Sequence, residues 1–474
     1  MTNQKPNLIL INCDDLGYGD LGVYGSELHN TPCLDNLANQ GRRFTDFYMA
    51  SPVCSPSRGA MLTGCYPPRI GFARFNDDWV LFPGDAEGLN PNEYTLGDLF
   101  KEAGYSTMTI GKWHCGDQPE FLPTRHGFDQ YYGLPYSNDM APMELRPDMP
   151  PLPLMHNEEI LEEQPDQTGL TERYVEKSIT FIRENRNNPF FLYLAHMHVH
   201  LPLYAAAPFV KKSKNGDYGA CVEAIDWATS VLIHELEKLN LLENTIIVFT
   251  SDNGSRNDYG PNNGPLRGTK ATTWEGGMRV PFIVYWKDNI DPAVCDGLIS
   301  SIDLLPSFAS MLGIKMPSDR KIDGINQIDY LLGKSEKSNR DTFYYYMCDN
   351  LEAIRYKNWK LHVSRRPGAG KPTGDFGDQN QDYEEAKNNY EVKELYDLSK
   401  DIGETNNLYL KEKNVVIALM EIVNQAREEL GDRFTGKAGK DIRSVGIVEN
   451  PKPLTEYDEN HPYIISLYDR NEAG

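Results

Sequence analysis

The stretch NLILINCDD, residues 7–15, decides the fold class of this chain. An apolar run without a charged side chain is typical of a buried strand, and two aspartates follow it directly. Three other apolar runs end in polar clusters, and they are STMTI (106–110), FFLYLAHM (190–197) and TIIVFT (245–250). A fifth run, VPFIVYW (280–286), carries no such cluster. We interpret all of these runs as buried parallel strands.

Helical patterns lie between the apolar runs. The stretch TPCLDNLANQG (31–41) has a threonine cap, a proline at the first helical position and a glycine after the end. The stretch 94–104 ends in glycine in the same way, and 218–240 is a long amphipathic pattern. Strands that alternate with helices predict an α/β fold with a large, mostly parallel central sheet sandwiched by helices. Such sheets bind ligands outside the carboxyl ends of their strands, where these polar clusters lie.

The pattern changes near Arg340. Three stretches have the period-two character of antiparallel strands, and they are DTFYYYM (341–347), EAIRYKNWKLHV (352–363) and KELYDLS (393–399). We expect a loop at 365–382, a helix at 414–430 and a wrapping, irregular tail from residue 449. The sequence therefore predicts a main domain over residues 1–339. A smaller C-terminal subdomain with an antiparallel sheet, a helix and the tail is expected over 340–474.

The charge of the chain excludes some classes of partner. The 474 residues carry a formal net charge of −22, whereas nucleic acids and anionic membranes attract basic surfaces. We expect neither as a partner, and an anionic substrate would need a locally basic pocket. The 8 cysteines form no C-x-x-C pair, so the sequence predicts neither a zinc site nor a disulfide scaffold.

The start of the chain bears on its compartment. The stretch MTNQKPNLILINCDD lacks the basic region, the long apolar region and the cleavage site of a secretory signal. No apolar run approaches the ~20 residues that cross a bilayer. Two alternatives stay open: a cytoplasmic protein, or a periplasmic or secreted one whose signal has been removed.

Acidic side chains follow two of the predicted strands. Asp14 and Asp15 come after the first strand, and Asp252 and Asn253 come after the strand at 245–250. Carboxylates that meet at one sheet edge repel each other unless a cation lies between them. Oxygen ligands suit Ca²⁺ or Mg²⁺ better than zinc. Either pair alone could be turn or helix-cap residues, but the two together favour a metal site.

Basic side chains gather at the same predicted edge. Any one of them could be an ordinary surface cation or a hydrogen-bonded core histidine. Together, and beside a divalent ion, they suit the tetrahedral oxyanion of a sulfate or phosphate ester. The residues concerned are Arg58, Lys112, His114, His198, His200 and Lys270.

The stretch CSPSRGAMLTG (54–64) carries a family resemblance. A cysteine before such a turn could simply pack as a small apolar group. Cys-x-Pro-Ser-Arg before Leu-Thr-Gly, however, resembles the modification signature of the type I sulfatases of the alkaline phosphatase superfamily. In that family the cysteine is oxidised to formylglycine. Further stretches resemble family motifs, and they are 7–25, GKWH (111–114), LPYSNDM (134–140), HVHLP (198–202), TSDNG (250–254), 264–281 and 394–408.

The resemblance extends from Asn7 to Leu408 and is closest to aryl- and N-acetylgalactosamine-sulfatases. Ile402 departs from the proline that the family often has there, in a turn far from the chemistry. The resemblance implies one Ca²⁺, held by Asp14, Asp15, Asp252 and Asn253 together with residue 54. It also implies that residues 1–339 form the catalytic domain.

The resemblance also implies roles for the basic residues. Arg58 would hold the nucleophile, and Lys112 and Lys270 would neutralise the sulfate oxygens. His114 would be the base that lets the sulfate leave, and His200 would protonate the leaving alcohol. We expect Ser137 and His198 on the substrate side, the role of His198 being open.

The implied activity is hydrolysis of a sulfate monoester, with a sulfated carbohydrate as the most expected substrate. Its implied partners are a sulfated small molecule or glycan and a maturation enzyme, of the formylglycine-generating or the radical type. Two alternatives stay open: a phosphate or phosphonate monoester hydrolase of the same superfamily, and a non-catalytic glycan-binding relative. We expect specificity to come from residues 72–90, 138–165 and the tail.

Overall fold

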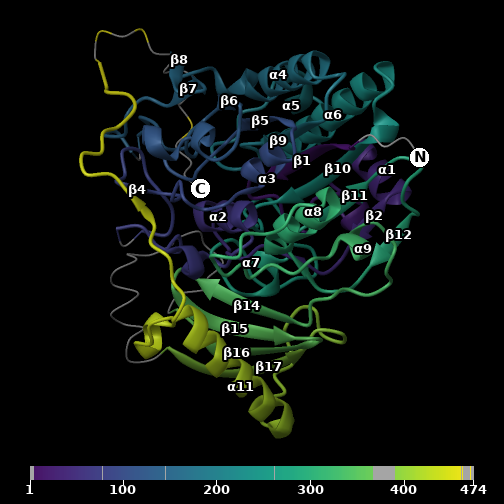
Figure 1. Ribbon diagram of the computed structural model, residues 1–474, viewed down its shortest axis with the longest axis vertical. Helices are drawn as coiled ribbons and strands as arrows, with labels where there is room; N and C mark the ends of the chain where they lie inside the picture. Colours follow the sequence, from purple (N-terminus) through teal and green to yellow (C-terminus); the bar gives the residue numbers. More distant parts are fainter. Residues whose placement is uncertain are drawn as a thin grey trace.

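The computed structural model describes residues 5–76, 78–144, 146–260, 262–366, 390–458, 460, 462 and 470. Within these residues a 10-stranded sheet, in the order β12-β2-β11-β10-β1-β9-β5-β6-β7-β8, crosses the middle of the molecule (Figure 1). Its strands are β1 (Asn7–Cys13), β2 (Arg42–Phe44), β5 (Ser106–Gly111), β6 (Gln130–Gly133), β7 (Pro153–His156), β8 (Glu159–Glu163), β9 (Phe190–Ala195), β10 (Thr245–Ser251), β11 (Phe282–Tyr285) and β12 (Ala293–Cys295).

The centre of the sheet is parallel, as the apolar runs predict. Strands β10, β1, β9, β5 and β6 pair in parallel. Strand β11 is antiparallel to β10, so the prediction of a parallel strand at 280–286 was wrong. The run is buried like its neighbours, and burial does not reveal the direction of a strand. The antiparallel direction also explains why no polar cluster follows this run. Its carboxyl end lies at the opposite edge of the sheet from those of the parallel strands.

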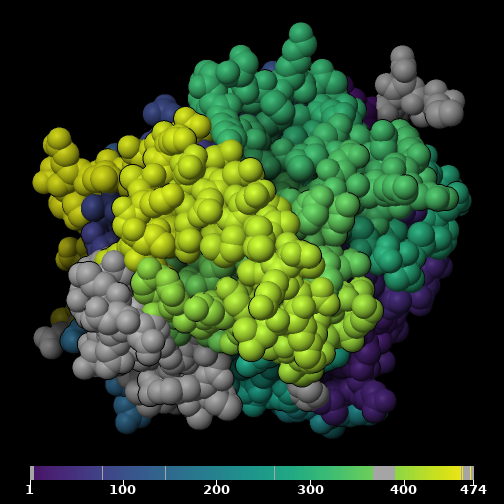
Figure 2. Space-filling view, turned by 90° about the horizontal axis from the view of Figure 1, so that it is seen from below, coloured from purple at the N-terminus to yellow at the C-terminus, as the bar shows by residue number. Residues whose placement is uncertain are grey.

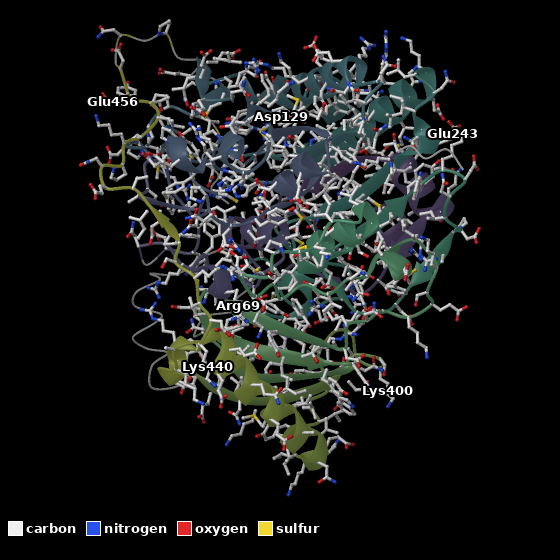
Figure 3. All side chains as sticks on the ribbon, in the orientation of Figure 1. Arg69, Asp129, Glu243, Lys400, Lys440 and Glu456 are labelled. Atoms are coloured by element: carbon white, nitrogen blue, oxygen red, sulfur yellow. The ribbon has the colours of Figure 1, made fainter. Side chains whose placement is uncertain are left out.

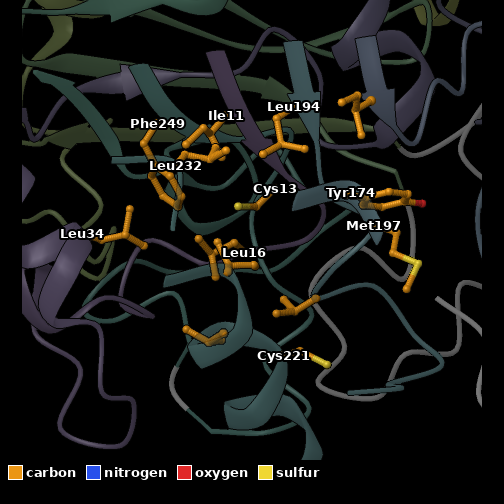
Figure 4. Packing of buried hydrophobic residues seen from close by; sticks show 14 of the residues in the cluster. Ile11, Cys13, Leu16, Leu34, Tyr174, Leu194, Met197, Cys221, Leu232 and Phe249 are labelled. Carbon is orange, nitrogen blue, oxygen red and sulfur yellow. The ribbon is translucent and has the colours of Figure 1, made fainter. Parts of the chain in front are cut away.

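Helices cover both faces of the sheet, which confirms the predicted sandwich. Ile9 and Ile11 of β1 pack under α1, α4 and α6, whereas Leu8 and Leu10 pack under α2, α3 and α8. Figure 4 shows the first face, where Leu232 of α6 lies near Phe249 of β10. The helices are α1 (Pro32–Gln40), α2 (Cys54–Thr63), α3 (Leu96–Glu102), α4 (Leu170–Glu184), α5 (Ala207–Val210), α6 (Gly216–Lys238), α7 (Glu275–Met278), α8 (Leu304–Leu312), α9 (Ile328–Leu331) and α11 (Lys413–Leu430). None of the described helices has the length and apolarity to span a membrane.

Helix α1 differs from its prediction in one detail. Thr31 precedes the helix, as the sequence predicts, but its side chain caps no backbone N–H group of the helix. Asp226 of α6 takes that place and accepts from the N–H groups of Cys33 and Leu34, at 3.3 and 2.8 Å. A carboxylate from another helix thus lies at the N-terminus of α1, where its negative charge interacts favourably with the helix dipole.

A separate 4-stranded antiparallel sheet follows in the chain, as predicted. Its strands are β14 (Thr342–Met347), β15 (Asn350–Tyr356), β16 (Trp359–Ser364) and β17 (Glu391–Asp397). The sheet lies below the main sheet in Figure 1 and packs against α11. Seen from below, the yellow-green and yellow C-terminal residues cover much of this end of the molecule (Figure 2). Of the predicted loop at 365–382, all but residues 365 and 366 lies outside the described residues.

The segment after α11 runs along the main domain, at the left edge of Figure 1. Its strand β18 (Gly446–Ile447) pairs with β4 (Glu87–Gly88). Beyond it, Thr455 Oγ1 donates to the carbonyl of Pro151 at 2.5 Å. Tyr48 of the main domain also shares a buried cluster with Phe343 of β14. The two parts of the chain are therefore in extensive contact, and the boundary at residue 340 stays a prediction.

One stability prediction concerns the junction of these parts, where Arg69 lies (Figure 3). The Arg69 side chain is 0% exposed, and its Nη2 lies 2.8 Å from Asp323 Oδ1. Arg69→Met would leave a buried carboxylate without its cation, so we expect the free energy of unfolding to fall by about 3–5 kcal/mol. Urea unfolding followed by circular dichroism measures this change.

The control is the exposed pair of Lys101 and Asp129, whose charged atoms lie 2.9 Å apart. Because water screens both charges, Lys101→Ala should cost at most about 1 kcal/mol. Equal losses for Arg69→Met and Lys101→Ala would contradict a stabilising role for the buried pair.

Candidate active site

Cys54 is the first residue of α2 and lies at the carboxyl edge of the main sheet. The backbone is extended at Val53, and Gly64 ends the helix at a φ of +67°, where a side chain would be strained. Cys54 is 1% exposed, and its Sγ lies 3.5 Å from Asp14 Oδ1. Burial raises the pKa of the Cys54 thiol well above its ordinary value. The unmodified residue is therefore a neutral thiol and a weak nucleophile.

The predicted acidic cluster is present. Strands β1 and β10 are parallel, and Cys13 pairs with Ser251 at their ends. Asp14 and Asp252, which follow these two residues, therefore lie side by side at the edge of the sheet. One ligand atom from each of Asp14, Asp15, Cys54 and Asp252 lies within 4.8 Å of the others. Burial and the charge of Asp14 raise the pKa of Asp252 to about 7. A cation among these carboxylates would remove that repulsion.

Asn253 supplies the test of whether these residues fit a metal ion. Its Nδ2 donates to Asp15 Oδ1 at 2.7 Å. Its Oδ1 is buried and has no hydrogen-bond partner among the described residues. A carbonyl oxygen beside several carboxylates matches the ligand preference of Ca²⁺, and a buried acceptor without a partner is costly. The residues therefore fit a calcium ion.

Three basic side chains face the three carboxylates. Arg58 Nε and Nη2 each lie 2.8 Å from Asp252 Oδ2. The Lys112 ammonium lies 2.5 Å from Asp14 Oδ2 and donates to Ser137 Oγ at 3.1 Å. Burial alone would raise the pKa of Asp14, but the neighbouring cations, Lys112 first, hold it well below its ordinary value.

Lys270 completes the set from a different loop, with its ammonium 2.9 Å from Asp15 Oδ2. Lys112 itself depends on a glycine: Gly111 has a φ of +104°, and a Cβ there would lie 1.8 Å from the carbonyl oxygen of Ala195. Strand β5 can therefore end this close to β9 only with glycine at 111.

Two histidines line the site, and burial favours the neutral form of both. His200 Nδ1 lies 2.6 Å from the carbonyl of Leu201, to which it donates, and Nε2 lies 3.3 Å from Ser137 Oγ. Burial and the charge of Lys270 lower the pKa of His200 to about 4. His114 Nε2 donates to the carbonyl of Leu81 at 3.0 Å. Burial and the charge of Lys112 lower the pKa of His114 well below its ordinary value. The Nδ1 atom of His114 has no partner among the described residues, so it can accept a proton.

His198 contacts the acidic cluster through its backbone. It is buried, its backbone carbonyl accepts from the N–H of Asp14 at 2.9 Å, and burial lowers the pKa of its ring to about 4. It does not line the pocket described next. Its placement on the substrate side stays an untested prediction.

A pocket of about 190 Å³ opens onto the cluster. Five of the predicted residues line it, namely Cys54, His114, Ser137, His200 and Lys270. The other lining residues are Val53, Trp79, Val80, Phe82, Asp139, Met140, Arg146 and Ala271. Most of these belong to 72–90 and 138–165, the ranges expected to carry specificity. Asp139 and Met140 fall in the motif LPYSNDM, but no motif marks Trp79, Val80, Phe82 or Arg146, because their role follows from where two long loops fold.

Two family models match this sequence. The model described as Sulfatase matches residues 6–314, and the model described as C-terminal region of aryl-sulfatase matches residues 338–438. Arylsulfatase A from Homo sapiens is 36% identical in an alignment of 430 positions that covers 85% of this chain and 83% of that protein. N-acetylgalactosamine-6-sulfatase from Canis lupus familiaris is 39% identical in an alignment of 378 positions that covers 76% of this chain and 72% of that protein.

A solved structure from Bacteroides thetaiotaomicron is also similar. It is described with the metabolism of multiple glycosaminoglycans, and it superimposes with a TM-score of 0.76 at 28% identity. The superposition covers 90% of this chain and 100% of the other.

Proposed function

This chain belongs to the sulfatase family, and from that premise we propose that it releases sulfate from sulfated carbohydrates, using a formylglycine made from Cys54 and one bound Ca²⁺. As a sulfatase it hydrolyses sulfate esters. One observation carries the finer proposal: Cys54 begins α2 beside three carboxylates and three cations, at the opening of a pocket. A buried neutral thiol has no evident use there unless it is modified.

Formylglycine at residue 54 would supply the nucleophile as a hydrated aldehyde. The motif CSPSR supports this modification, and it implies a maturation enzyme of the formylglycine-generating or the radical type. Arg58 lies four residues further along α2, with its guanidinium shared between Asp252 and the carbonyl of Lys112. That fixed position suits a residue that orients the nucleophile.

Ca²⁺ would be held by Asp14, Asp15, Asp252 and Asn253 together with residue 54, and it would supply positive charge for the ester oxygens. Lys112 and Lys270 flank the carboxylates from opposite loops. When an anionic ester enters, the two ammonium groups can bind its oxygens and exclude water from them. Ser137, which accepts from Lys112, would fix the orientation of that lysine and of the ester.

The two histidines suit the proton transfers. Burial favours the neutral form of His114, and its Nδ1 atom has no partner in the described part of the chain, so it can take a proton as sulfate leaves. His200 must gain a proton before it can give one to the leaving alcohol. An anionic ester beside it would stabilise the charged ring and so raise its pKa.

The substrate class rests on the relatives and on the pocket. One relative is named for N-acetylgalactosamine 6-sulfate esters, and a similar structure is described with glycosaminoglycans. The pocket combines the rings of Trp79 and Phe82 with the ion pair of Asp139 and Arg146, whose atoms lie 2.7 Å apart. Aromatic faces with adjacent donors and acceptors suit a sugar ring and its hydroxyl groups.

The role of His200 leads to a prediction about leaving groups. A sugar alkoxide leaves poorly without a proton, whereas a nitrophenolate needs little help. His200→Ala should therefore slow sugar sulfates by about 10²- to 10⁴-fold and nitrophenyl sulfate far less. The measurement is kcat/KM across leaving groups of increasing pKa. An equal loss for all of them would make His200 a positioning residue and would contradict its role as the acid.

The proposed function is tested on protein produced together with a maturation enzyme. Release of inorganic sulfate is measured on a panel of defined sulfated sugars, with nitrophenyl sulfate and nitrophenyl phosphate as a matched pair. We expect sulfate esters to be preferred and at least one sulfated sugar to be cleaved. Faster cleavage of the phosphate ester, or no turnover by matured protein, would contradict the proposal.

A further inference from the structure

The loop at 267–274 carries Lys270 into the site, and the backbone on either side of the lysine side chain is held by hydrogen bonds. The N–H of Lys270 donates to Ser255 O at 3.0 Å, and the N–H of Ala271 donates to Pro52 O at 2.9 Å. Ala271 has a φ of +63°, in the left-handed region that a residue with a Cβ rarely adopts. Such a backbone conformation persists only where the surrounding structure holds it.

The C-terminal sheet provides that support at Thr273, three residues beyond Lys270. Glu352 of β15 accepts a hydrogen bond from Thr273 Oγ1 at 2.7 Å. The Lys360 ammonium of β16 donates to the carbonyl of Thr273 at 2.9 Å. The three residues are 2%, 1% and 0% exposed respectively. One threonine is therefore bound through its hydroxyl and its carbonyl by two buried, charged side chains.

Further contacts join the C-terminal part of the chain to both ends of the loop. The Lys360 ammonium also lies 2.9 Å from Glu275 and 3.0 Å from Glu404. Glu404 in turn accepts from the N–H of Glu275 at 2.8 Å, and its carbonyl accepts from Arg267 at 2.8 Å. Residues that follow position 339 thus hold the loop at Arg267, at Thr273 and directly after its end at Glu275.

Buried charged side chains are not required for stability here, because well-packed apolar side chains of similar volume would stabilise the same contact equally well. Here the charged atoms of Glu352 and Lys360 converge on Thr273, in the loop that carries an active-site cation. Misplacing a catalytic group by about 1 Å can cost about 10²-fold in rate. Fixing the loop is therefore a sufficient reason to keep these charges.

We propose that Glu352 and Lys360 are positioning residues for Lys270, which they hold in place by fixing Thr273. The C-terminal subdomain then supports the active site although none of its described residues lines the pocket. This inference rests on the proposed function, since that function gives Lys270 its role on the sulfate.

The experiment removes the hydroxyl of Thr273 and keeps its shape. Thr273→Val loses the hydrogen bond to Glu352, and we expect kcat/KM on a sulfate ester to fall by about 10- to 100-fold. Thr273→Ser keeps the hydroxyl and should stay within about threefold of the parent protein. Thr229→Val is the matched control, because Thr229 is 1% exposed and its hydroxyl donates to Ile225 O at 3.0 Å, inside α6. It should leave kcat/KM unchanged.

A double-mutant cycle separates positioning from stability. If Thr273 acts through Lys270, adding Thr273→Val to Lys270→Ala should cause no further loss. A further loss as large as in the parent protein, or equal effects of Thr273→Val and Thr229→Val, would overturn the proposal. Should Thr273→Val not fold, Thr273→Ala is judged by the same criteria.

A second readout does not depend on turnover. The dissociation constant of inorganic sulfate is measured by calorimetry in Ca²⁺ buffer, on protein whose Cys54 is unmodified. We expect about 10-fold weaker binding for Thr273→Val and unchanged binding for Thr273→Ser. Unchanged binding in both would overturn the proposal. Failure of the proposed function is distinguishable, because matured parent protein would then cleave no sulfate ester.

Discussion

Cys54→Ala should abolish sulfate release, with a loss in kcat/KM of about 10⁴-fold or more, as expected when a nucleophile is removed. Alanine cannot be oxidised to an aldehyde, and the carboxylates, cations and histidines around it have no reactive oxygen to direct at the ester. The measurement is kcat/KM on nitrophenyl sulfate, with the parent and the variant produced beside the same maturation enzyme.

Cys221→Ala is the matched control, because Cys221 is fully buried in the core cluster of Figure 4 and lies outside the pocket lining. It should leave kcat/KM within about threefold of the parent. Mass spectrometry of the peptide that contains residue 54 should find the aldehyde in active protein. Full activity in protein whose Cys54 is entirely unmodified would contradict the proposed mechanism.

Asp252→Asn should remove both the metal ion and the activity, with a loss of about 10³-fold in kcat/KM. Asparagine keeps the shape of the side chain but loses the charge that faces Arg58 at 2.8 Å and completes the acidic cluster. Elemental analysis after dialysis should find one Ca²⁺ per chain in the parent and less than one in the variant.

The control for Asp252→Asn is Asp226→Asn, a change at another buried carboxylate, which caps α1 and does not belong to the acidic cluster. Its calcium content should match that of the parent. Zinc in the parent protein, or an active sample without any metal, would contradict the assignment of the site to Ca²⁺.

Much of the candidate site follows from local sequence. A strand buried on both faces needs an uninterrupted apolar run, and the polar residues after it must leave the sheet at the strand end. Local sequence is therefore enough to place Asp14, Lys112 and Asp252 at one edge of the sheet. The start of α2 at Cys54 and its end before Gly64 are local features in the same sense.

The direction of β11 is a property of a different kind. VPFIVYW is equally apolar in a parallel or an antiparallel strand, and only its pairing with β10 and β2 fixes the direction. His198 and His200 are likewise two residues apart in one motif. Only the path of the chain after β9 places His200 in the pocket lining and leaves His198 out of it.

The sequence by itself determined the fold class, the strand ends that carry the chemistry, and the resemblance of the Cys54 motif. These depend on apolar patterns and spacings within a few residues. Only the tertiary structure decided that Trp79, Asp139 and Arg146 form a pocket wall, and that Glu352 and Lys360 reach Thr273. Such contacts join residues from loops and strands far apart in the chain, and their energy exists only once both partners are folded, so no short stretch of sequence carries a signal for them.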